Sequence, residues 1–418
     1  MRSSIWVQIM PTDLVRAASV PTARDTRNTT VLRVGLVGCG AFARFSLARY
    51  RLLPGVAIEA VADVDPAAAQ RAAADLDAAV LEPEAILTAP GIDLVYIATP
   101  PSCHFPQALA ALEAGKHVLV EKPLATTVAD AETLAAAAAG RGLVCVANLV
   151  ERYSPLADAV RSVIRSKLLG ELVHGLFVNE AADEGLGVHH WFWDRDVSGG
   201  IFIEHGVHFF DLCSYWLGRG RVVTAARSIR PARTGLEGTP PVEEQVMCTC
   251  RYAGDASNAT PSSAEPHAGV LFHFEHGFHQ PSRLDRQEMR LVFERGELRL
   301  FDWVPTHGDL RGLLDNAAVE SLAGMLPGST VRRLERYAGD NQHVRGRFRS
   351  FDASVLAEIS FTSGMDKLDL YGQVISDLFA DQLGWIRDRA HRRRLTEADG
   401  VASVAMACAA DRMAMQGP

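Results

Sequence analysis

Residues 198–211 combine two glycines with four side chains able to exchange or orient a proton, and read SGGIFIEHGVHFFD. If residues 201–212 form a helix, Glu204, His208 and Asp211 lie at positions i, i+4 and i+7, on one face. A carboxylate on that face can orient an imidazole or tune its pKa, and an imidazole exchanges a proton near neutral pH. The spacing therefore indicates acid–base chemistry, although an amphipathic core helix with buried, hydrogen-bonded polar groups explains it as well.

A second candidate is Lys122, because the chain contains only four lysines. It follows the apolar run 118–120 and precedes Pro123, which stiffens the turn. Ligands bind at the C-terminal ends of strands in parallel sheets. A lysine can also share a proton with a substrate hydroxyl, because burial lowers its pKa. A solvated loop lysine explains the position equally well.

A glycine-rich turn precedes both candidates. Residues 38–43 read Gly38-Cys39-Gly40-Ala41-Phe42-Ala43 and fit the pattern Gly-x-Gly-x-x-Gly/Ala. Gly38 permits a tight turn, Gly40 lets a pyrophosphate approach the backbone, and Ala43 allows close helix packing. Asp63 ends the next predicted strand, where a carboxylate binds a ribose diol and repels a 2′-phosphate. The combination predicts NAD rather than NADP; alternatively Asp63 caps the next helix, a role that Asp65 before Pro66 fills better.

The elements that position these residues follow two different patterns. From 31 to 149, short continuous apolar runs alternate with alanine-rich amphipathic stretches. Strands are predicted at 31–37, 56–63, 94–98, 117–120 and 143–147, and helices at 41–53, 66–76, 106–114 and 128–139. Continuous apolar strands that alternate with helices predict a doubly wound parallel sheet of the Rossmann type, covered on both faces.

After Asn148 the pattern changes. A helix is predicted at 155–168, and long alternating runs follow, at 221–229, 245–252, 270–278 and 288–302. Such runs predict an open, largely antiparallel sheet in a C-terminal α+β domain. Residues 254–266 are expected to form a flexible loop, 306–354 an insertion of loops and short helices, and 368–390 and 397–415 the closing helices. The predicted domains are therefore a mobile N-terminal extension (1–30), an NAD-binding domain (31–149) and a substrate-binding and oligomerisation domain (150–418).

Composition excludes several classes of protein. The 418 residues are 48% hydrophobic and 22% charged, values typical of a globular protein with a sizeable core. A net charge of −8 gives no basic field for nucleic acid, and no apolar run reaches the roughly 18 to 20 residues of a membrane helix. The seven scattered cysteines form no zinc or disulfide pattern. We expect a cytoplasmic protein that binds neither nucleic acid nor membrane.

The glycine turn, the Thr99-Pro100-Pro101 stretch with His104, and Glu121-Lys122-Pro123 together resemble the Gfo/Idh/MocA oxidoreductase family. The segment 198–211 also resembles the family signature, glycines followed by Asp-x-Gly-x-His-x-x-Asp. The likeness extends from about residue 32 to 415. It implies a Rossmann domain paired with an α/β domain whose open sheet faces the substrate. It also implies that Thr99, Pro100, His104, Glu121 and Lys122 contact the cofactor, and that Lys122 contacts the substrate too.

The same resemblance gives His208 the role of catalytic acid/base. Aspartate is common in the family at the position of Glu204, and the extra methylene moves this carboxylate by roughly an ångström or more. The implied mechanism has His208 take a hydroxyl proton, Lys122 stabilise the developing negative charge, and Glu204 hold His208 in orientation. His205 is expected to be structural or to lie at the pocket rim.

Several residues are expected on the substrate side. Glu180 ends a predicted strand, and the run 189–195 (HHWFWDR) is rich in aromatic rings that can face a sugar or cyclitol ring. Packing within the domain is the alternative for any single ring, and Trp303 is too remote in sequence to assign. The predicted substrate contacts are Lys122, Asn148, Arg152, Glu180, Trp191, Trp193, Glu204 and His208, those at the domain junction following from the family resemblance.

The function that follows is an NAD-dependent dehydrogenase acting on a secondary alcohol of a sugar, amino sugar or cyclitol. Two alternatives remain: a redox-neutral enzyme that retains NAD for epimerisation, elimination or hydrolysis, and a non-catalytic cofactor-binding regulator. A metal held by His189, His190 and His208 is not expected, because no HExxH-type pair is present. The uncovered face of the open sheet predicts a homodimer or homotetramer.

Overall fold

The computed structural model describes residues 31–183, 185–230, 242–253, 269–281, 283–346 and 349–416. The predicted N-terminal extension and the predicted loop 254–266 lie outside these residues. Within them, no helix is long and apolar enough to cross a membrane.

The N-terminal part is a six-stranded parallel sheet in the order β3-β2-β1-β4-β5-β6. Its strands are β1 (Leu32–Val37), β2 (Val56–Ala62), β3 (Ala79–Val80), β4 (Leu94–Ile97), β5 (His117–Val120) and β6 (Cys145–Ala147). The intervening helices are α2 (Ala41–Tyr50), α3 (Pro66–Leu76), α4 (Pro83–Thr88), α5 (His104–Glu113) and α6 (Val128–Arg141). All four residues of β4 are buried, as continuous apolar strands covered on both faces require. The predicted Rossmann sheet is confirmed; the prediction missed β3 and α4, which are two and six residues long.

The C-terminal part is a nine-stranded sheet in the order β14-β17-β13-β12-β11-β7-β10-β9-β8. Among the described strands of this sheet, only β7 and β10 pair in parallel, so the predicted largely antiparallel sheet is confirmed. Its strands are β7 (Leu172–Glu180), β8 (Gly220–Arg230), β9 (Val242–Tyr252), β10 (Val270–Gly277), β11 (Arg286–Phe293), β12 (Gly296–Phe301), β13 (His307–Leu314), β14 (Thr330–Arg336) and β17 (Val355–Thr362).

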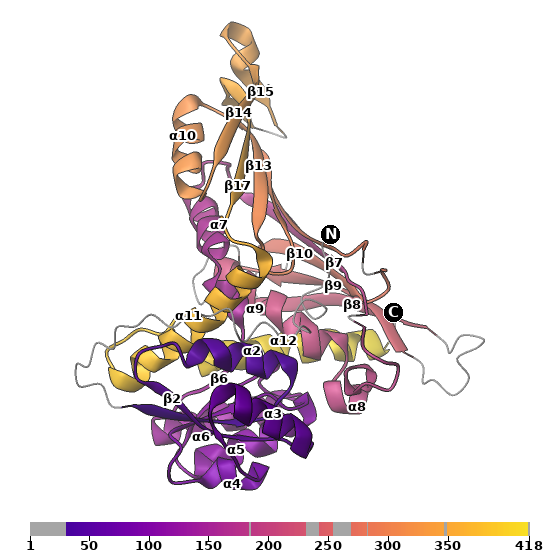
Figure 1. The fold of residues 1–418 in the computed structure, drawn as a ribbon. Helices are drawn as coiled ribbons and strands as arrows, with labels where there is room; N and C mark the ends of the chain where they lie inside the picture. Colours follow the sequence, from indigo (N-terminus) through magenta and orange to yellow (C-terminus); the bar gives the residue numbers. More distant parts are fainter. Residues whose placement is uncertain are drawn as a thin grey trace.

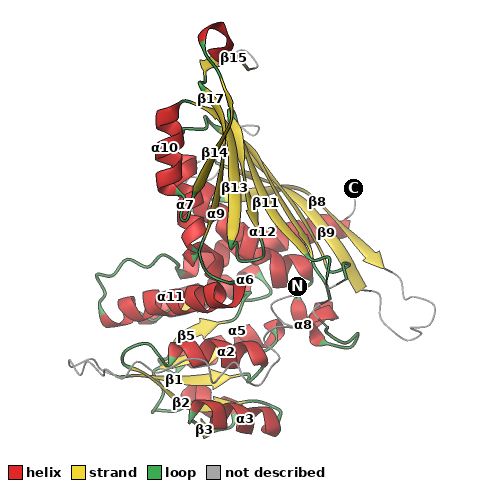
Figure 2. Cartoon of the chain, turned by 45° about the horizontal axis from the view of Figure 1, so that its top comes forward, coloured by secondary structure: helices red, strands yellow, loops and turns green. Residues whose placement is uncertain are grey.

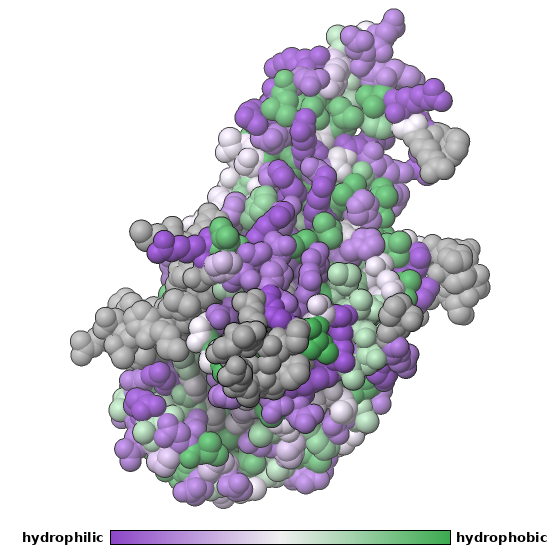
Figure 3. All heavy atoms as spheres, turned by 90° about the vertical axis from the view of Figure 1, so that its right-hand side faces the viewer, coloured by the Kyte–Doolittle hydropathy of each residue, from purple (hydrophilic) through white to green (hydrophobic). Residues whose placement is uncertain are grey.

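Helices cover one face of this large sheet and leave the other open (Figures 1 and 2). They are α7 (Pro155–Ser166), α9 (Val207–Leu217), α10 (Asn316–Met325) and α12 (Glu397–Gln416). Alternate residues of β17 are buried, as expected for a strand with one covered face. The open face carries a row of ion pairs such as Arg299–Asp309 and Arg332–Glu358. Seen from the side, hydrophilic and hydrophobic residues are interspersed over this part of the molecule (Figure 3).

The segment 306–354 differs from the prediction of loops and short helices. It contains β13, α10 and β14, a 3-10 turn at Gly339–Gln342, and the two-stranded sheet of β15 (His343–Arg345) and β16 (Ser350–Asp352). The strands β13 and β14 extend the large sheet through pairing with β17. The prediction failed because the partner strand comes later in the chain, so no hairpin signal marks the pairing. This part projects farthest from the Rossmann sheet (Figure 1).

Helix α11 (Lys367–Arg387) and α12 return from the large sheet to the Rossmann sheet, close to the predicted bounds. Phe379 of α11 stacks on Tyr50 of α2 with ring centroids 4.2 Å apart. In α12, the Glu397 carboxylate accepts a hydrogen bond of 3.0 Å from the backbone N–H of Cys145 in β6. These contacts fix the closing helices of the second domain against α2 and β6 of the Rossmann domain.

Candidate active site

Lys122 lies two residues after the end of β5 and reaches across to the second domain. Its Nζ donates to the backbone carbonyl of Glu204 at 3.0 Å and also to the Glu204 carboxylate. The two side chains are only 13% and 5% exposed. The peptide between Lys122 and Pro123 is cis. The amine from the first domain and the carboxylate from the second therefore form one buried ion pair.

The predicted α-helix over 201–212 is partly wrong, because Phe202–Gly206 forms a π-helix and α9 begins only at Val207. Single π-helical turns recur at functional sites. The wider turn changes which residues share a face. Among the described residues, no hydrogen bond joins Glu204 to His208; Glu204 is paired with Lys122 instead. The expectation that Glu204 orients His208 is therefore corrected.

His208 is buried beside this pair, and its Nδ1 atom has no hydrogen-bond partner in the described part of the chain. Its ring lies edge-on to Trp303, with centroids 5.4 Å apart, and 6.2 Å from the ring of His205. Burial, and then the positive charge of Lys122, lower the pKa of His208 well below its usual value. At neutral pH the imidazole is therefore uncharged and able to accept a proton.

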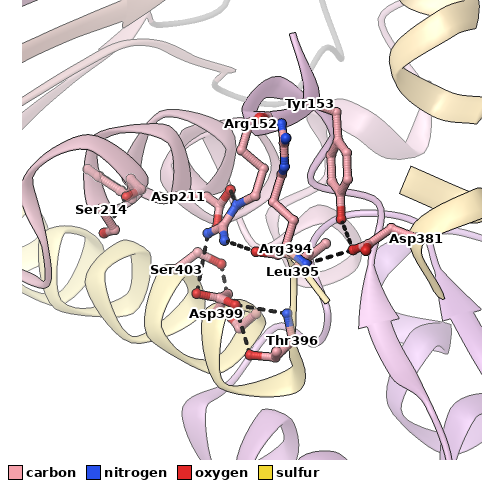
Figure 4. A network of polar contacts seen from close by, with 12 residues as sticks. Arg152, Tyr153, Asp211, Ser214, Asp381, Arg394, Leu395, Thr396, Asp399 and Ser403 are labelled. Carbon is pink, nitrogen blue, oxygen red and sulfur yellow. Dashed lines mark hydrogen bonds and ion pairs between the residues drawn. The ribbon is translucent and has the colours of Figure 1, made fainter. Parts of the chain in front are cut away.

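Arg152 is placed differently from its predicted role as a substrate contact. Its guanidinium binds both carboxylate oxygens of Asp211 on α9, with 2.8 Å from Nε to Oδ2. It also lies 3.3 Å from Asp399 and donates to the backbone carbonyl of Arg394 at 2.8 Å (Figure 4). The Arg152 and Asp211 side chains are 4% and 1% exposed. Arg152 therefore ties α9 to α12 and to the junction between the domains, and its guanidinium is engaged by these protein groups.

The residues around Lys122 are held by a second buried network. The Glu121 carboxylate accepts hydrogen bonds from the Tyr96 hydroxyl and from the Asn148 side-chain amide, the latter at 2.9 Å. Burial raises the pKa of Glu121, and these hydrogen bonds oppose the rise. Glu121 thus supports the turn that carries Lys122. Asn148 keeps a buried Oδ1 without a partner among the described residues, so its predicted substrate contact stays a prediction.

His104 is fully buried, which corrects its predicted role as a direct cofactor contact. Its ring nitrogens lie 2.7 Å from the carbonyl oxygen of Pro123 and 2.8 Å from that of Thr99. Burial lowers its pKa to about 4 despite both carbonyls. His104 therefore holds together the turns that follow β4 and β5. The Thr99 hydroxyl donates to Gln107 at 2.7 Å, and Pro100 lies in the same turn.

The glycine turn fits a dinucleotide. Gly38 has φ +94°, and a Cβ there would lie 2.5 Å from the carbonyl oxygen of Ala98. Gly40 stands at the N-terminus of α2, where no side chain caps the free N–H groups and a Cβ would meet no atom within 4 Å. Open space in front of free helix N–H groups suits a pyrophosphate. Ala43 is buried, as close helix packing requires, whereas Ala41 is half-buried and the ring of Phe42 packs on Tyr371, 5.8 Å away.

Asp63 lies beside this turn at the end of β2. Its carboxylate accepts hydrogen bonds from the backbone N–H groups of Cys39 at 2.6 Å and Asp65 at 2.8 Å. Asp65 caps α3 by accepting from Ala67 at 2.9 Å, so the capping role belongs to Asp65. Arg71 lies 3.7 Å from Asp65. Two carboxylates at this edge favour a ribose diol over a 2′-phosphate, so the residues present fit NAD.

A cavity of about 170 Å³ adjoins Glu204. Phe192 and Trp193 line it, within the short turn Trp191–Trp193. Phe192 packs edge-on against Phe278, with centroids 5.1 Å apart. Trp191 is half-buried, and its ring lies 5.2 Å from His190. The aromatic run thus contributes Phe192 and Trp193 to the cavity wall.

The charged neighbours of this aromatic run have partners within the protein. The carboxylate of Asp194 caps a short helix by accepting from Asp196 at 2.9 Å. Arg195 pairs with Glu243 and Asp411. Glu180 ends β7 in register with Gly277 and Arg286, and its substrate contact stays a prediction. Within the described residues, no three His, Cys, Asp or Glu side chains are grouped to hold a metal ion.

Two residues near His208 were missed by the sequence analysis. Trp303 packs against His205 with ring centroids 4.1 Å apart, and His276 lies 4.5 Å from His205. No local signal marks Trp303, because it follows β12, far along the chain. His276 did carry a signal: it continues the buried series Phe272 and Phe274 on β10, where an apolar residue is expected.

The parallel sheet with its glycine turn, joined to a large mixed sheet with a histidine-bearing helix, defines a two-domain dinucleotide-binding protein. Residues 32–149 match the family model described as "Oxidoreductase family, NAD-binding Rossmann fold", and residues 157–299 match the GFO/IDH/MocA C-terminal domain. The chain therefore belongs to the Gfo/Idh/MocA oxidoreductase family, as the sequence motifs predicted. Its first domain is an NAD-binding Rossmann domain.

Curated relatives match part of the chain. A dTDP-3,4-didehydro-2,6-dideoxy-alpha-D-glucose 3-reductase of Streptomyces antibioticus is 34% identical over 191 residues, which are 45% of this chain and 57% of that protein. Inositol 2-dehydrogenase 4 of Saccharopolyspora erythraea is 32% identical over 218 residues, 50% of this chain and 60% of that protein. Each match spans about half of this chain and less than two thirds of the relative.

Solved structures match over almost the whole chain. Levoglucosan dehydrogenase in complex with NADH and levoglucosan has a TM-score of 0.70 at 18% identity, covering 93% of this chain and 98% of that chain. The WlbA dehydrogenase from Bordetella pertussis, in complex with NADH and UDP-GlcNAcA, has a TM-score of 0.66 at 18% identity, covering 94% and 98%. These likenesses confirm the predicted two-domain fold.

Proposed function

We propose that the protein is an NAD-dependent oxidoreductase that acts on a secondary alcohol, or the corresponding ketone, of a sugar, amino sugar or cyclitol. The single observation that carries the proposal is the buried contact between Lys122 and the π-helix that precedes His208. It brings a fixed ammonium group from one domain close to an uncharged imidazole from the other. Such a pair can move a proton on and off one substrate oxygen.

NAD, when bound, takes or returns the hydride. In the oxidation direction His208 accepts the hydroxyl proton, for which its imidazole has to be in the uncharged form. Lys122 places a positive charge beside the oxygen on which negative charge develops. Glu204 acts on Lys122, which it holds through one carboxylate oxygen. The other oxygen, Oε2, is buried without a partner among the described residues, so it is free to accept from a substrate hydroxyl.

The relatives support the class of substrate. The two curated proteins act, by their names, on a deoxysugar nucleotide and on inositol. The solved dehydrogenase structures hold levoglucosan or UDP-GlcNAcA. All four compounds carry ring hydroxyl or ring carbonyl groups, and the same reacting group is proposed for this chain.

A fluorescence screen for NADH tests the proposal. The purified protein is incubated with NAD and a panel of sugars, amino sugars and inositols. At least one compound is expected to give NADH. Lys122→Met and His208→Asn are then expected to retain NADH binding but to lose about 10²-fold or more in kcat. Lys167→Met, which removes an exposed lysine paired with Glu171, is the matched control and should change nothing. Near-normal turnover in either active-site variant would contradict the proposal.

The same screen separates the two alternatives. A redox-neutral enzyme would be purified with bound NAD and would convert a sugar without added cofactor. A regulator would bind NAD and a sugar without any turnover. We propose a cytoplasmic location, since all seven cysteines are free thiols.

We propose in addition that the open sheet face packs against a second copy, as in a homodimer or homotetramer. Exposed apolar side chains such as Val173 and Met247 lie among its ion pairs. Light scattering after gel filtration tests this assembly, and a monomeric mass at micromolar concentration would contradict it.

A further inference from the structure

Three buried aromatic residues beside His208 form a cluster that the mechanism above does not use. They come from three separate elements: His205 from the π-helix, His276 from β10, and Trp303 from the turn after β12. The His205 ring contacts both of the others, with ring centroids 4.1 Å from Trp303 and 4.5 Å from His276. His205 and Trp303 are each 8% exposed, and His276 is 4% exposed.

The polar atoms of this region are unusual for a packed core. Glu204 Oε2, His205 Nδ1 and His208 Nδ1 are all buried, and none has a hydrogen-bond partner in the described part of the chain. Buried polar atoms are nearly always hydrogen-bonded, so each such atom needs an explanation. Three of them within five consecutive residues, next to Lys122 and the cavity at Glu204, point to a ligand with several polar groups.

The charges of the cluster define the chemistry of that ligand. Burial lowers the pKa of His276 to about 3 and that of His205 well below its usual value, with Lys122 adding to both effects. The histidines are therefore neutral, and each imidazole carries one donor and one acceptor nitrogen. The nitrogens of His276 are contacted by the Asn179 side-chain amide, 2.7 Å from Nδ1 and 3.1 Å from Nε2. Of these two histidines, His205 therefore holds the nitrogen that has no partner in the described part of the chain. Lys122 and Glu204 neutralise each other. This arrangement complements hydroxyl groups, which also donate and accept, and offers no net charge to a carboxylate or phosphate.

We propose that His205, His276 and Trp303 form a second-hydroxyl subsite, which binds a hydroxyl near the reacting carbon of an uncharged polyol ring. The proposal rests on the function proposed above and names its substrate class. The rings of His205 and His208 are 6.2 Å apart, so one six-membered ring reaches both. His205 is the specificity-determining residue, because its ring contacts both other members of the subsite and carries the unpartnered nitrogen. The indole of Trp303 fixes its ring plane.

The test is a cycle of protein variants and deoxy ligands. Binding of myo-inositol, D-glucose, 2-deoxy-D-glucose and 3-deoxy-D-glucose to the NADH-loaded protein is measured by calorimetry, which needs no turnover. D-Glucuronate and glucose 6-phosphate serve as charged counterparts. The wild type is expected to bind an uncharged polyol at least 10-fold more tightly than either charged compound. Removing the recognised hydroxyl is expected to cost roughly 10- to 100-fold in affinity.

The variants isolate His205. His205→Phe keeps an aromatic ring and is expected to lose the same 10- to 100-fold on the parent sugar, with no further loss on the deoxy sugar. His205→Gln, which keeps a polar side chain, should recover part of the loss. His273→Phe is the control. His273 lies on β10, the strand that carries His276, but its side chain is exposed and contacts Thr249.

Three results would overturn the inference. The first is that the loss of affinity caused by His205→Phe and the loss caused by the deoxy sugar multiply when the two changes are combined. The others are tighter binding of a charged compound and no binding of any uncharged polyol in the panel. Failure of the proposed function is a different outcome. If the two changes together cost no more affinity than one alone, but no compound yields NADH, the subsite is retained and the dehydrogenase function is rejected. If NADH forms but the two losses of affinity multiply, the dehydrogenase function is retained and the subsite is rejected.

Discussion

Replacing Asp211 with asparagine removes the negative partner of the buried Arg152 and leaves that guanidinium with Asp399 and one backbone carbonyl. Breaking a buried ion pair from one side costs about 3–5 kcal/mol, because an uncompensated charge remains in the interior. Unfolding 418 residues carries an entropy of about 0.9 kcal/mol/K, taking roughly 2.1 cal/mol/K per residue. The expected fall in Tm is therefore about 3–6 °C.

Differential scanning calorimetry at pH 8 measures this change. Burial raises the pKa of Asp211 to about 6, with Arg152 opposing the rise, so the carboxylate is ionised at pH 8. The matched control is Asp309→Asn on the open sheet face. Asp309 makes the same two-point contact with Arg299, at 2.9 Å for both bonds, but the pair is 19% and 40% exposed. Exposed pairs contribute about 0–1 kcal/mol, so this Tm should fall by no more than about 1 °C.

A double variant completes the argument. Arg152→Met with Asp211→Leu replaces both charges by apolar groups, and its Tm should lie well above that of Asp211→Asn. Equal losses for Asp211→Asn and Asp309→Asn, or a double variant less stable than the single one, would refute the reasoning that burial of an unpaired charge sets the cost.

Three further predictions concern the first domain. Gly38→Ala should lower Tm, because Gly38 has φ +94° and a Cβ there would lie 2.5 Å from the carbonyl oxygen of Ala98. Gly40→Ala should leave Tm unchanged but weaken NADH binding roughly 10-fold in a fluorescence titration. Asp63→Ser should lower the preference for NAD over NADP at least 10-fold in kcat/KM, and an unchanged ratio would exclude a ribose contact. Burial lowers the pKa of His104 to about 4 in the folded state, while the unfolded chain binds that proton near pH 6.5, so stability is lost as pH falls from 6.5 to 4. For this residue the free energy of unfolding falls by about 3 kcal/mol over that range. His104→Asn should therefore flatten the slope of Tm against pH between pH 6.5 and 4. An unchanged slope would show that other groups cause the loss of stability in acid.

Local features were predictable from the sequence. The glycine turn, Asp63 and the strand–helix alternation depend on residues within one βαβ unit, so spacing alone located them. The end of β5 likewise placed Lys122 at the ligand-binding edge of the sheet. The two closing helices were found close to their actual bounds because their signals also come from local residues.

Long-range partners were not predictable. The π-helical turn pairs Glu204 with Lys122, 82 residues away, and nothing in the local sequence separates this from a regular helix that pairs Glu204 with His208. The family resemblance assigned Arg152 to the substrate, whereas its actual partner Asp211 lies 59 residues further on. The exception is His276, whose place in the buried series of β10 could have marked it.

The central claim is that Lys122 and His208, from different domains, act on the same substrate oxygen. A crystal structure of the complex with NADH and the compound found in the screen measures this directly. The account predicts that Lys122 Nζ and His208 Nε2 both lie within about 2.6–3.2 Å of one oxygen atom of the substrate. Two different oxygens, or a substrate that contacts only one of the two nitrogens, would contradict it.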